Sequence, residues 1–185
     1  MSATTIVAHG GVLDDWLQHR RALGLDTRDE IWNGTYHVTP HAHASHGRLA
    51  ARLIVGLHAA ASAVGLVALT EFNLGVEDDF RVPDLGFLPA AEEDGLGLYV
   101  PSAAIVVEII SPDDASYAKI PFYLARGVKE VWLLDPTART LSIHSPTTAT
   151  TSSTLSSQRG DASNTPQRST VLGIDASEVT AQLGW

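Results

Sequence analysis

The sequence predicts a protein of the α/β (α+β) class, with helices and strands in a single domain. Its 185 residues suit one domain with a substantial core and leave little room for two. Residues 46–64 are rich in alanine and leucine, with the apolar residues on one helical stripe. Residues 104–111, AIVVEIIS, are instead rich in the β-branched residues that favour a buried strand.

The first third of the chain predicts a helix, a hairpin and a second helix. Residues 13–23 place leucine and tryptophan at helical spacing, and Gly24 follows as a stop signal. Residues 29–39 contain an Asn-Gly dipeptide, a strong hairpin signal, and therefore predict a strand pair. The long helix over 46–64 comes next.

The rest of the chain predicts several strands and two further helices. Strand-like segments lie within 66–75, 80–89, 103–111, 129–136 and 139–146. A helix is expected near 117–126, ended by Gly127. Residues 145–170 are dominated by serine and threonine and predict a flexible loop. Residues 169–185 predict a short strand and a terminal helix.

The composition excludes several kinds of site. The chain has no cysteine, so any metal must be bound by oxygen or histidine. Its start lacks the features of a secretory signal, and no apolar run approaches the roughly 18 residues of a membrane span. We therefore expect a soluble, cytoplasmic protein with no membrane partner. A net charge of −9, with only two lysines, argues against a broad phosphate-binding surface.

Two acidic residues interrupt the apolar strands. Glu108 lies within AIVVEIIS, and Asp84 is the only acid in RVPDLGFLP. A buried carboxylate is costly unless a cation or hydrogen bonds compensate for it. Neighbouring strands that each carry one carboxylate can direct both at a divalent cation such as Mg²⁺. Alternatively, each acid lies at a strand end, in solvent or beside an arginine such as Arg81 or Arg126.

The sequence around these acids resembles a nuclease family. The similar segments are PDLGFLP at 83–89, VVEIISP at 106–112, Lys119, Tyr123, and GVKEVWLLDP at 127–136. Their type and order are similar to the Uma-two family of restriction endonucleases, within the PD-(D/E)xK nuclease superfamily. Upstream, an acid and a glycine ahead of a proline and a histidine resemble the family's opening block: Glu30, Gly34, Pro40 and His46.

The resemblance implies a restriction-endonuclease-like fold, in which a mixed β-sheet is flanked by helices and adjacent strands carry metal-binding acids. It implies that Asp84, Glu108 and the backbone carbonyl of Ile109 bind Mg²⁺ or Mn²⁺, which lowers the pKa of a bound water. Lys119 would orient that water or neutralise the developing negative charge. Glu30 would supply a further carboxylate.

The chain departs from the pattern at three places. The superfamily's lysine lies two residues after the acid, where this chain has Ile110; the similar family takes it from the following helix, here Lys119. An acid that often lies three or four residues before that lysine is replaced by Ala115 and Ser116, and the alternative is that Asp113 or Asp114 substitutes for it. Pro121 predicts a helix that begins no earlier than Ala118, because proline is tolerated only in the first turn.

Three histidines lie close together in HAHASH. A zinc site formed by His41, His43 and His46 is the weaker interpretation, because no carboxylate or fourth ligand is spaced nearby. We interpret His41 and His43 as loop residues. The resemblance places His46 near the active site or at the start of the long helix as its cap.

Other polar and aromatic residues have simpler interpretations. Glu71 is either a fourth acid facing the site or an exposed residue on an edge strand, and the second is favoured. Tyr123 and Trp132 are expected in the core, with the Tyr123 hydroxyl one turn from Lys119 and able to hold it. Acids 92–94 predict a solvated loop that would repel DNA.

Two functions from different classes follow. The first is a metal-dependent endonuclease that hydrolyses phosphodiester bonds in DNA with metal-activated water. The second is a nuclease-fold protein without catalysis that acts as a binding or scaffold module, because fold alone does not fix function. The family, together with the small number of basic residues in one copy, predicts a homodimer.

Overall fold

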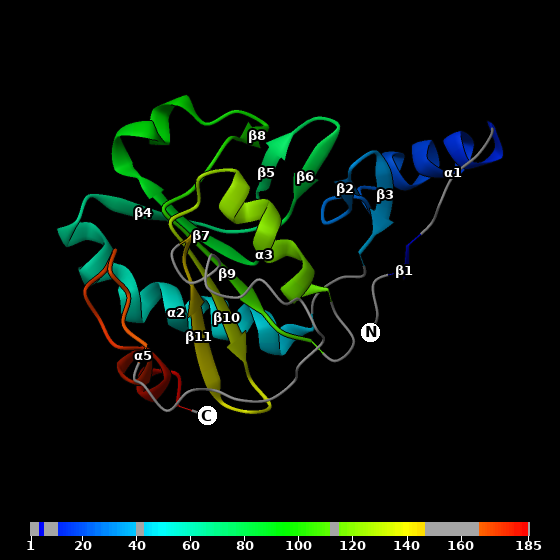
Figure 1. The fold of residues 1–185 in the computed structure, drawn as a ribbon. Helices are drawn as coiled ribbons and strands as arrows, with labels where there is room; N and C mark the ends of the chain where they lie inside the picture. Colours follow the sequence, from blue (N-terminus) through cyan, green and yellow to red (C-terminus); the bar gives the residue numbers. More distant parts are fainter. Residues whose placement is uncertain (1–3, 6–10, 40–42, 112–114, 147–166, 185) are drawn as a thin grey trace.

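The computed structural model describes residues 4–5, 11–39, 43–111, 115–146 and 167–184 (Figure 1). Its helices and strands follow in this order: β1 (Thr4–Thr5), α1 (Gly11–Ala22), β2 (Glu30–Trp32), β3 (Thr35–Val38), α2 (Ala44–Ala63), β4 (Leu66–Leu69), β5 (Asn73–Val76), β6 (Asp79–Arg81), β7 (Leu85–Pro89), the 3₁₀ helix η1 (Ala90–Gly95), β8 (Tyr99–Val100), β9 (Ile105–Ile109), α3 (Ser116–Ala125), β10 (Glu130–Asp135), β11 (Thr140–His144) and α5 (Ala176–Gln182). The predicted loop lies largely outside the described residues.

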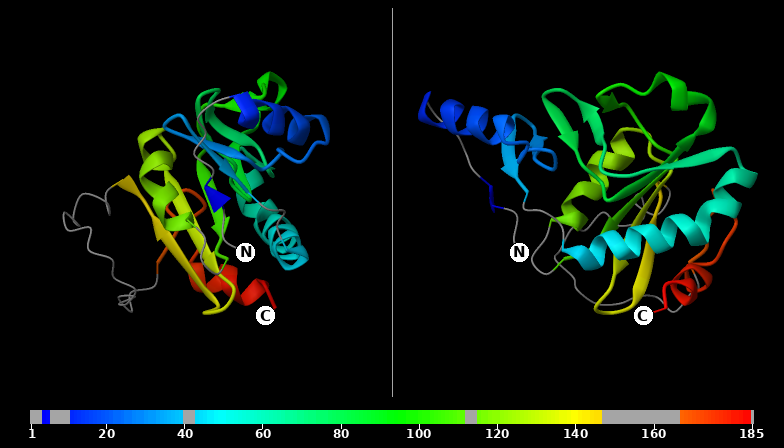
Figure 2. Two further views of the ribbon diagram at one scale, coloured as in Figure 1. Left: turned by 90° about the vertical axis from the view of Figure 1, so that its right-hand side faces the viewer. Right: turned by 180° about the vertical axis from the view of Figure 1, so that it is seen from behind.

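The strands form two mixed sheets, which confirms the predicted fold class and adds a second sheet to it. The five-stranded core sheet has the order β11-β10-β9-β7-β4, with β9 and β10 parallel and the other pairs antiparallel. The second has the order β1-β3-β2-β6-β5-β8 and contains the predicted hairpin at its Asn-Gly turn. The β2–β3 end of that sheet, with α1, projects from the body (Figures 1 and 2).

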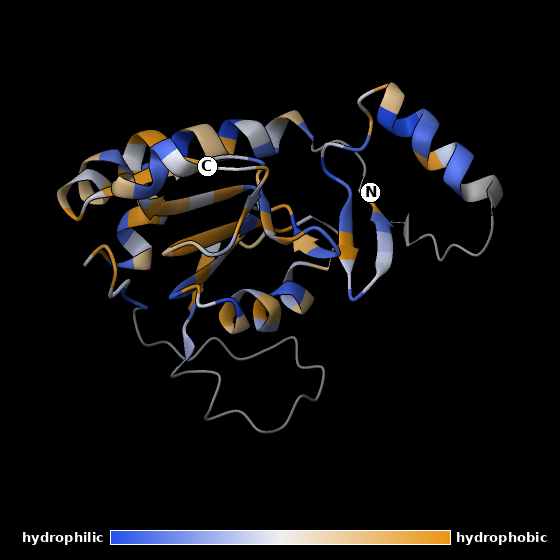
Figure 3. Ribbon diagram, turned by 90° about the horizontal axis from the view of Figure 1, so that it is seen from above, coloured by the Kyte–Doolittle hydropathy of each residue, from blue (hydrophilic) through white to orange (hydrophobic). Residues whose placement is uncertain are grey.

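Helices cover both faces of the five-stranded sheet. Alternate strand residues point to opposite faces, so Val107 packs with α2 whereas Val106 packs with Tyr123 of α3. Figure 3 shows these strands in hydrophobic colours between α2 and α3. The α2 side is lined by one stripe of buried residues on that helix: Leu49, Leu53, Leu57 and Ala61. Trp132 of β10 is fully buried, as predicted.

Two local predictions were wrong. Helix α3 begins at Ser116, two residues before the expected limit, so Pro121 lies beyond the first turn. Because proline has no N–H, it leaves one helical carbonyl without its usual donor, which a ten-residue helix packed on the sheet tolerates. Residues 170–172 form a turn, and the strand expected there is reduced to an isolated bridge between Arg168 and Asp175.

The described residues contain no helix that is both long and apolar enough to cross a membrane.

Candidate active site

The two acids that interrupt the apolar strands face each other. Strands β7 and β9 are antiparallel and pair Gly86 with Val106 and Leu85 with Val107. The same register, carried one residue further, places Asp84 opposite Glu108. The predicted strand pairing is therefore confirmed, although Asp84 lies just before β7 and not within it.

Asp84 is held between an arginine and a backbone amide. Its Oδ1 accepts a hydrogen bond from Arg28 Nη2 at 2.7 Å, and its Oδ2 accepts one from the Ile109 amide at 2.8 Å. The arginine beside Asp84 is therefore Arg28. The two arginines considered from the sequence, Arg81 and Arg126, instead contact Asp79. The Ile109 contact ties Asp84 to the end of β9.

Glu108 is almost fully buried and lies within a group of charges. Its Oε1 accepts a hydrogen bond from the Tyr123 hydroxyl at 2.5 Å and lies 3.2 Å from Lys119 Nζ. Burial raises the pKa of the Glu108 carboxyl to about 8, and the charges of Asp84 and Glu30 act in the same direction against Lys119. Three carboxylates, those of Glu108, Asp84 and Glu30, therefore act on one another at this point, against the ammonium of Lys119.

Lys119 links Glu108 to Glu30. Its Nζ donates a hydrogen bond to Glu30 Oε1 at 2.8 Å, and the same oxygen accepts one from the Val82 amide. Burial opposes the charge of the ammonium, but Glu108 and Glu30 outweigh it and raise the pKa of Lys119. Residues from β2, β9 and α3 thus meet at one point, as the resemblance implied.

Of the three supporting residues predicted from the sequence, Tyr123 contacts Glu108, whereas His46 and Glu71 contact neighbouring residues. The Tyr123 hydroxyl holds Glu108 and not the lysine, while its ring lies in the core. His46 Nε2 lies 3.2 Å from Ser111 Oγ, just past β9. The N-cap of α2 is His43, so His46 does not cap it. Glu71 is exposed in the turn after β4 and pairs with Arg28.

Comparison with known proteins identifies the family. The fold is similar to a solved structure from Anabaena variabilis ATCC 29413, described as "a putative nuclease belonging to DUF820", with a TM-score of 0.63 and 17% identity. That match covers 84% of this chain and 90% of the other. No curated protein matches the sequence significantly. The profile of the family described as "Uma2: Putative restriction endonuclease" matches residues 14–176. The chain belongs to the Uma2 family.

Uma2 membership and the fold together indicate a restriction-endonuclease-like nuclease. The matched range contains every residue of the group described above. The matched range also contains the three histidines considered for a zinc site, of which His41 lies outside the described residues. Among the residues that are described, no group of three or more histidine or acidic side chains forms a ready metal site.

The donors around Glu108 nevertheless fit a hard divalent cation. Asp84 and Glu108 present carboxylate oxygens, and Mg²⁺ is commonly bound by one or two carboxylates with several waters. Within the described part of the chain, both contacts of Glu108 use Oε1, which leaves Oε2 for a further ligand. A cation at this position would favour the charged form of Glu108 and so oppose the effect of burial on its pKa.

Two residues that hold the carboxylates of the site, Arg28 and Trp32, were not predicted from the sequence. Arg28 lies in the loop before β2, and nothing in its local pattern distinguishes it from a surface arginine. Trp32 donates its indole N–H to Glu30 Oε2 at 2.7 Å and so fixes that carboxylate. The alternation of β2 was a usable signal, because Glu30 and Trp32 are two residues apart and lie on one face of the strand.

Proposed function

We propose that this chain is a divalent-metal-dependent endonuclease that hydrolyses phosphodiester bonds in DNA. The observation that carries the proposal is the pair of carboxylates, Glu30 and Glu108, around Lys119, with Asp84 opposite Glu108, in a member of the Uma2 family. Buried charges cost stability even when Lys119 and Arg28 pair with them, and a site for charged chemistry explains why they are there.

The residues would divide the work as follows. Asp84, Glu108 and the backbone carbonyl of Ile109 would hold Mg²⁺ or Mn²⁺. When bound, the ion supplies Lewis-acid chemistry, lowering the pKa of a bound water and stabilising charge on the phosphate. Lys119 would donate a hydrogen bond from Nζ to the reacting phosphate or to the attacking water. Glu30 keeps that ammonium in place through its 2.8 Å hydrogen bond.

The acids of the 3₁₀ helix η1 lie away from this site and therefore do not repel DNA there. The exposed acids of η1 follow the end of β7, whereas Asp84 precedes its beginning. The negative charge that would repel DNA is therefore at the opposite end of that strand from the proposed centre.

Isosteric variants test the proposal directly. We expect Asp84→Asn and Glu108→Gln to abolish cleavage of plasmid and linear DNA in Mg²⁺ or Mn²⁺ while both remain folded by circular dichroism. Glu93→Gln, on exposed η1, removes the same charge and serves as the matched control. Titration calorimetry with Mn²⁺ adds an independent measurement. If Asp84→Asn binds Mn²⁺ as tightly as the wild type, the site is wrong whatever the activity.

A non-catalytic binding or scaffold module is the second candidate. The observation in its favour is that Lys119 and Arg28 are both already paired with carboxylates, in a chain whose net charge is −9. Absence of cleavage of single- and double-stranded DNA and RNA, in both metals and at high protein concentration, would establish this candidate in place of the nuclease.

We further propose a homodimer as the form that binds DNA. Helix α1 projects from the body (Figure 2), and apolar residues in and just after it are exposed: Trp16, Leu23 and Leu25. A second copy would cover them and double the number of phosphate contacts. Light scattering should give a mass near twice that of one chain, and a monomer mass would contradict this.

A further inference from the structure

A pocket of about 380 Å³ opens beside Asp84, and Lys119 is not among its lining residues. It lies between the loop before β2, the first turns of α2 and the turn after β4. Its polar lining consists of Arg28, His43, His46, Thr70, Glu71 and Asp84. The pocket thus shares Asp84 and its partner Arg28 with the candidate active site and adds side chains from α2 and from the turn after β4.

Arg28 is the most buried cation of this pocket, and part of its guanidinium can donate hydrogen bonds to a ligand. Its side chain is 11% exposed, and its Nη2 and Nη1 contact Asp84 and Glu71. Its Nε is buried and has no hydrogen-bond partner among the residues that the structure describes. A guanidinium presents its N–H groups in a planar fork that suits two oxygens of a phosphate. Arg28 Nη1 contacts Glu71, so a ligand in the pocket that displaces Glu71 gains this side of the fork.

The second partner of Arg28 is easily displaced. Glu71 is 56% exposed at its side chain, so its ion pair with Arg28 is screened by solvent and contributes little stability. Glu71 also has a φ of 50°, in the left-handed region that residues with a side chain rarely adopt. A phosphate carries its charge on several oxygens and competes well with one exposed carboxylate for the same fork.

We propose that Arg28 binds a phosphate group of the nucleic-acid strand in this pocket, displacing Glu71, and so positions the strand against Asp84. The inference rests on the proposed function and names the part of the site that holds the substrate. The start of α2 lines the same pocket, and the positive end of a helix favours an anion. The phosphate is either an internal phosphodiester or a terminal 5′-phosphate.

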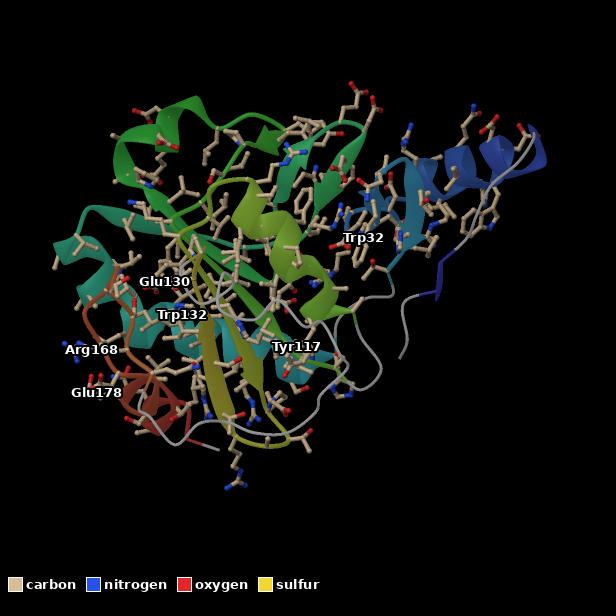
Figure 4. All side chains as sticks on the ribbon, viewed as in Figure 1. Trp32, Tyr117, Glu130, Trp132, Arg168 and Glu178 are labelled. Carbon is tan, nitrogen blue, oxygen red and sulfur yellow. The ribbon has the colours of Figure 1, made fainter. Side chains whose placement is uncertain are left out.

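Binding of labelled oligonucleotides in Ca²⁺, followed by fluorescence anisotropy, tests the proposal. We expect Arg28→Gln to weaken binding about tenfold, since charged hydrogen bonds to a phosphate are lost. Arg168→Gln removes the same charge at the far side of the molecule (Figure 4), in an exposed pair with Asp175, and should bind like the wild type. Comparing oligonucleotides with and without a 5′-phosphate distinguishes the two sources: an equal Arg28 effect on both indicates an internal phosphodiester.

A second variant keeps the proposal testable if Arg28→Gln unfolds. Glu71→Gln alters an exposed side chain and should tighten binding by a few-fold, because it removes the group that competes for Arg28. Unchanged or weaker binding in Glu71→Gln, or wild-type affinity in folded Arg28→Gln, would overturn the inference. Failure of the wild type to bind either oligonucleotide would overturn it as well.

The outcomes separate this inference from the proposed function. Weaker binding in Arg28→Gln, without cleavage by the wild type in any metal, would support the phosphate pocket and reject the nuclease. Metal-dependent cleavage that requires Asp84, with KM and oligonucleotide binding unchanged in Arg28→Gln, would do the reverse. If Arg28 positions the strand, Arg28→Gln should raise KM more than it lowers kcat.

Discussion

Lys119 Nζ lies 3.2 Å from Glu108 Oε1, the oxygen that also accepts the hydrogen bond of the Tyr123 hydroxyl. The lysine comes from α3 and the acid from the end of β9, so the helix supplies the cation that a lysine two residues after the acid would otherwise supply. Ile110 occupies that position and packs beside the core on the α3 side. The site thus keeps its lysine although the local signature lacks it.

We expect Lys119→Gln to abolish DNA cleavage and to destabilise the fold. Removing the ammonium leaves Glu30 and Glu108 buried together without their shared cation, which typically costs about 3–5 kcal/mol. Urea denaturation and a cleavage assay measure the two effects. Lys129→Gln is the matched control, since Lys129 is exposed and is the chain's other lysine. Equal stability in the two variants would contradict the close pairing.

The raised pKa of Glu108 predicts a pH-dependent stability in the metal-free protein. Its folded pKa of about 8 is above the ordinary value of 4.5, so the folded state binds the proton more tightly. The stability gained from that proton is complete below the ordinary value and is lost as pH rises through about 8. The free energy of unfolding should therefore fall by a few kcal/mol from about pH 6 to about pH 9. Glu108→Gln should remove this fall; an unchanged profile would show that another group causes it.

The fold class and the pairing of the acid-bearing strands could be predicted from the sequence. Alternation in AIVVEIIS and RVPDLGFLP is a local signal, and a glycine-containing connection of that length favours antiparallel pairing. The division of the strands between two sheets depends on side-chain packing between distant segments, which a single sequence does not display. Helix α3 shows the same limit, since packing on the sheet overrides the local penalty of Pro121.

The candidate site was predictable only in its acids and its lysine. Asp84 and Glu108 are conspicuous because charges are rare in apolar strands. Arg28 is not, since it is separated from Asp84 by 56 residues and lies in a loop of ordinary polarity. Its role appears only when folding brings the loop before β2 against the start of β7.

Tyr123→Phe should raise the pKa of Glu108 further. The hydroxyl donates to Glu108 Oε1, and this hydrogen bond favours the charged carboxylate. Its loss should shift the pH-dependent fall in stability to higher pH and cost about 1–2 kcal/mol at alkaline pH. Urea denaturation across pH measures both. Phe122→Leu, in the same helix but with no hydroxyl, should leave the midpoint of the fall where it is in the wild type.

Glu130 should prove structural and unconnected to the metal site. It is almost fully buried, and its carboxylate accepts hydrogen bonds from Trp132, Ser169, Thr170 and the Val171 amide (Figure 4 labels Glu130 and Trp132). Although burial opposes the charge, these donors lower the pKa of Glu130.

Glu130→Gln replaces one acceptor oxygen by an NH₂ group that faces donors, so we expect a loss of about 2–3 kcal/mol in urea denaturation. Because the donors Ser169, Thr170 and Val171 are in the segment after residue 166, that segment should become more susceptible to limited proteolysis. Mn²⁺ affinity measured by calorimetry should equal that of the wild type, since no contact of Glu130 involves Asp84 or Glu108. A loss of Mn²⁺ binding in folded Glu130→Gln would place the metal elsewhere in the protein.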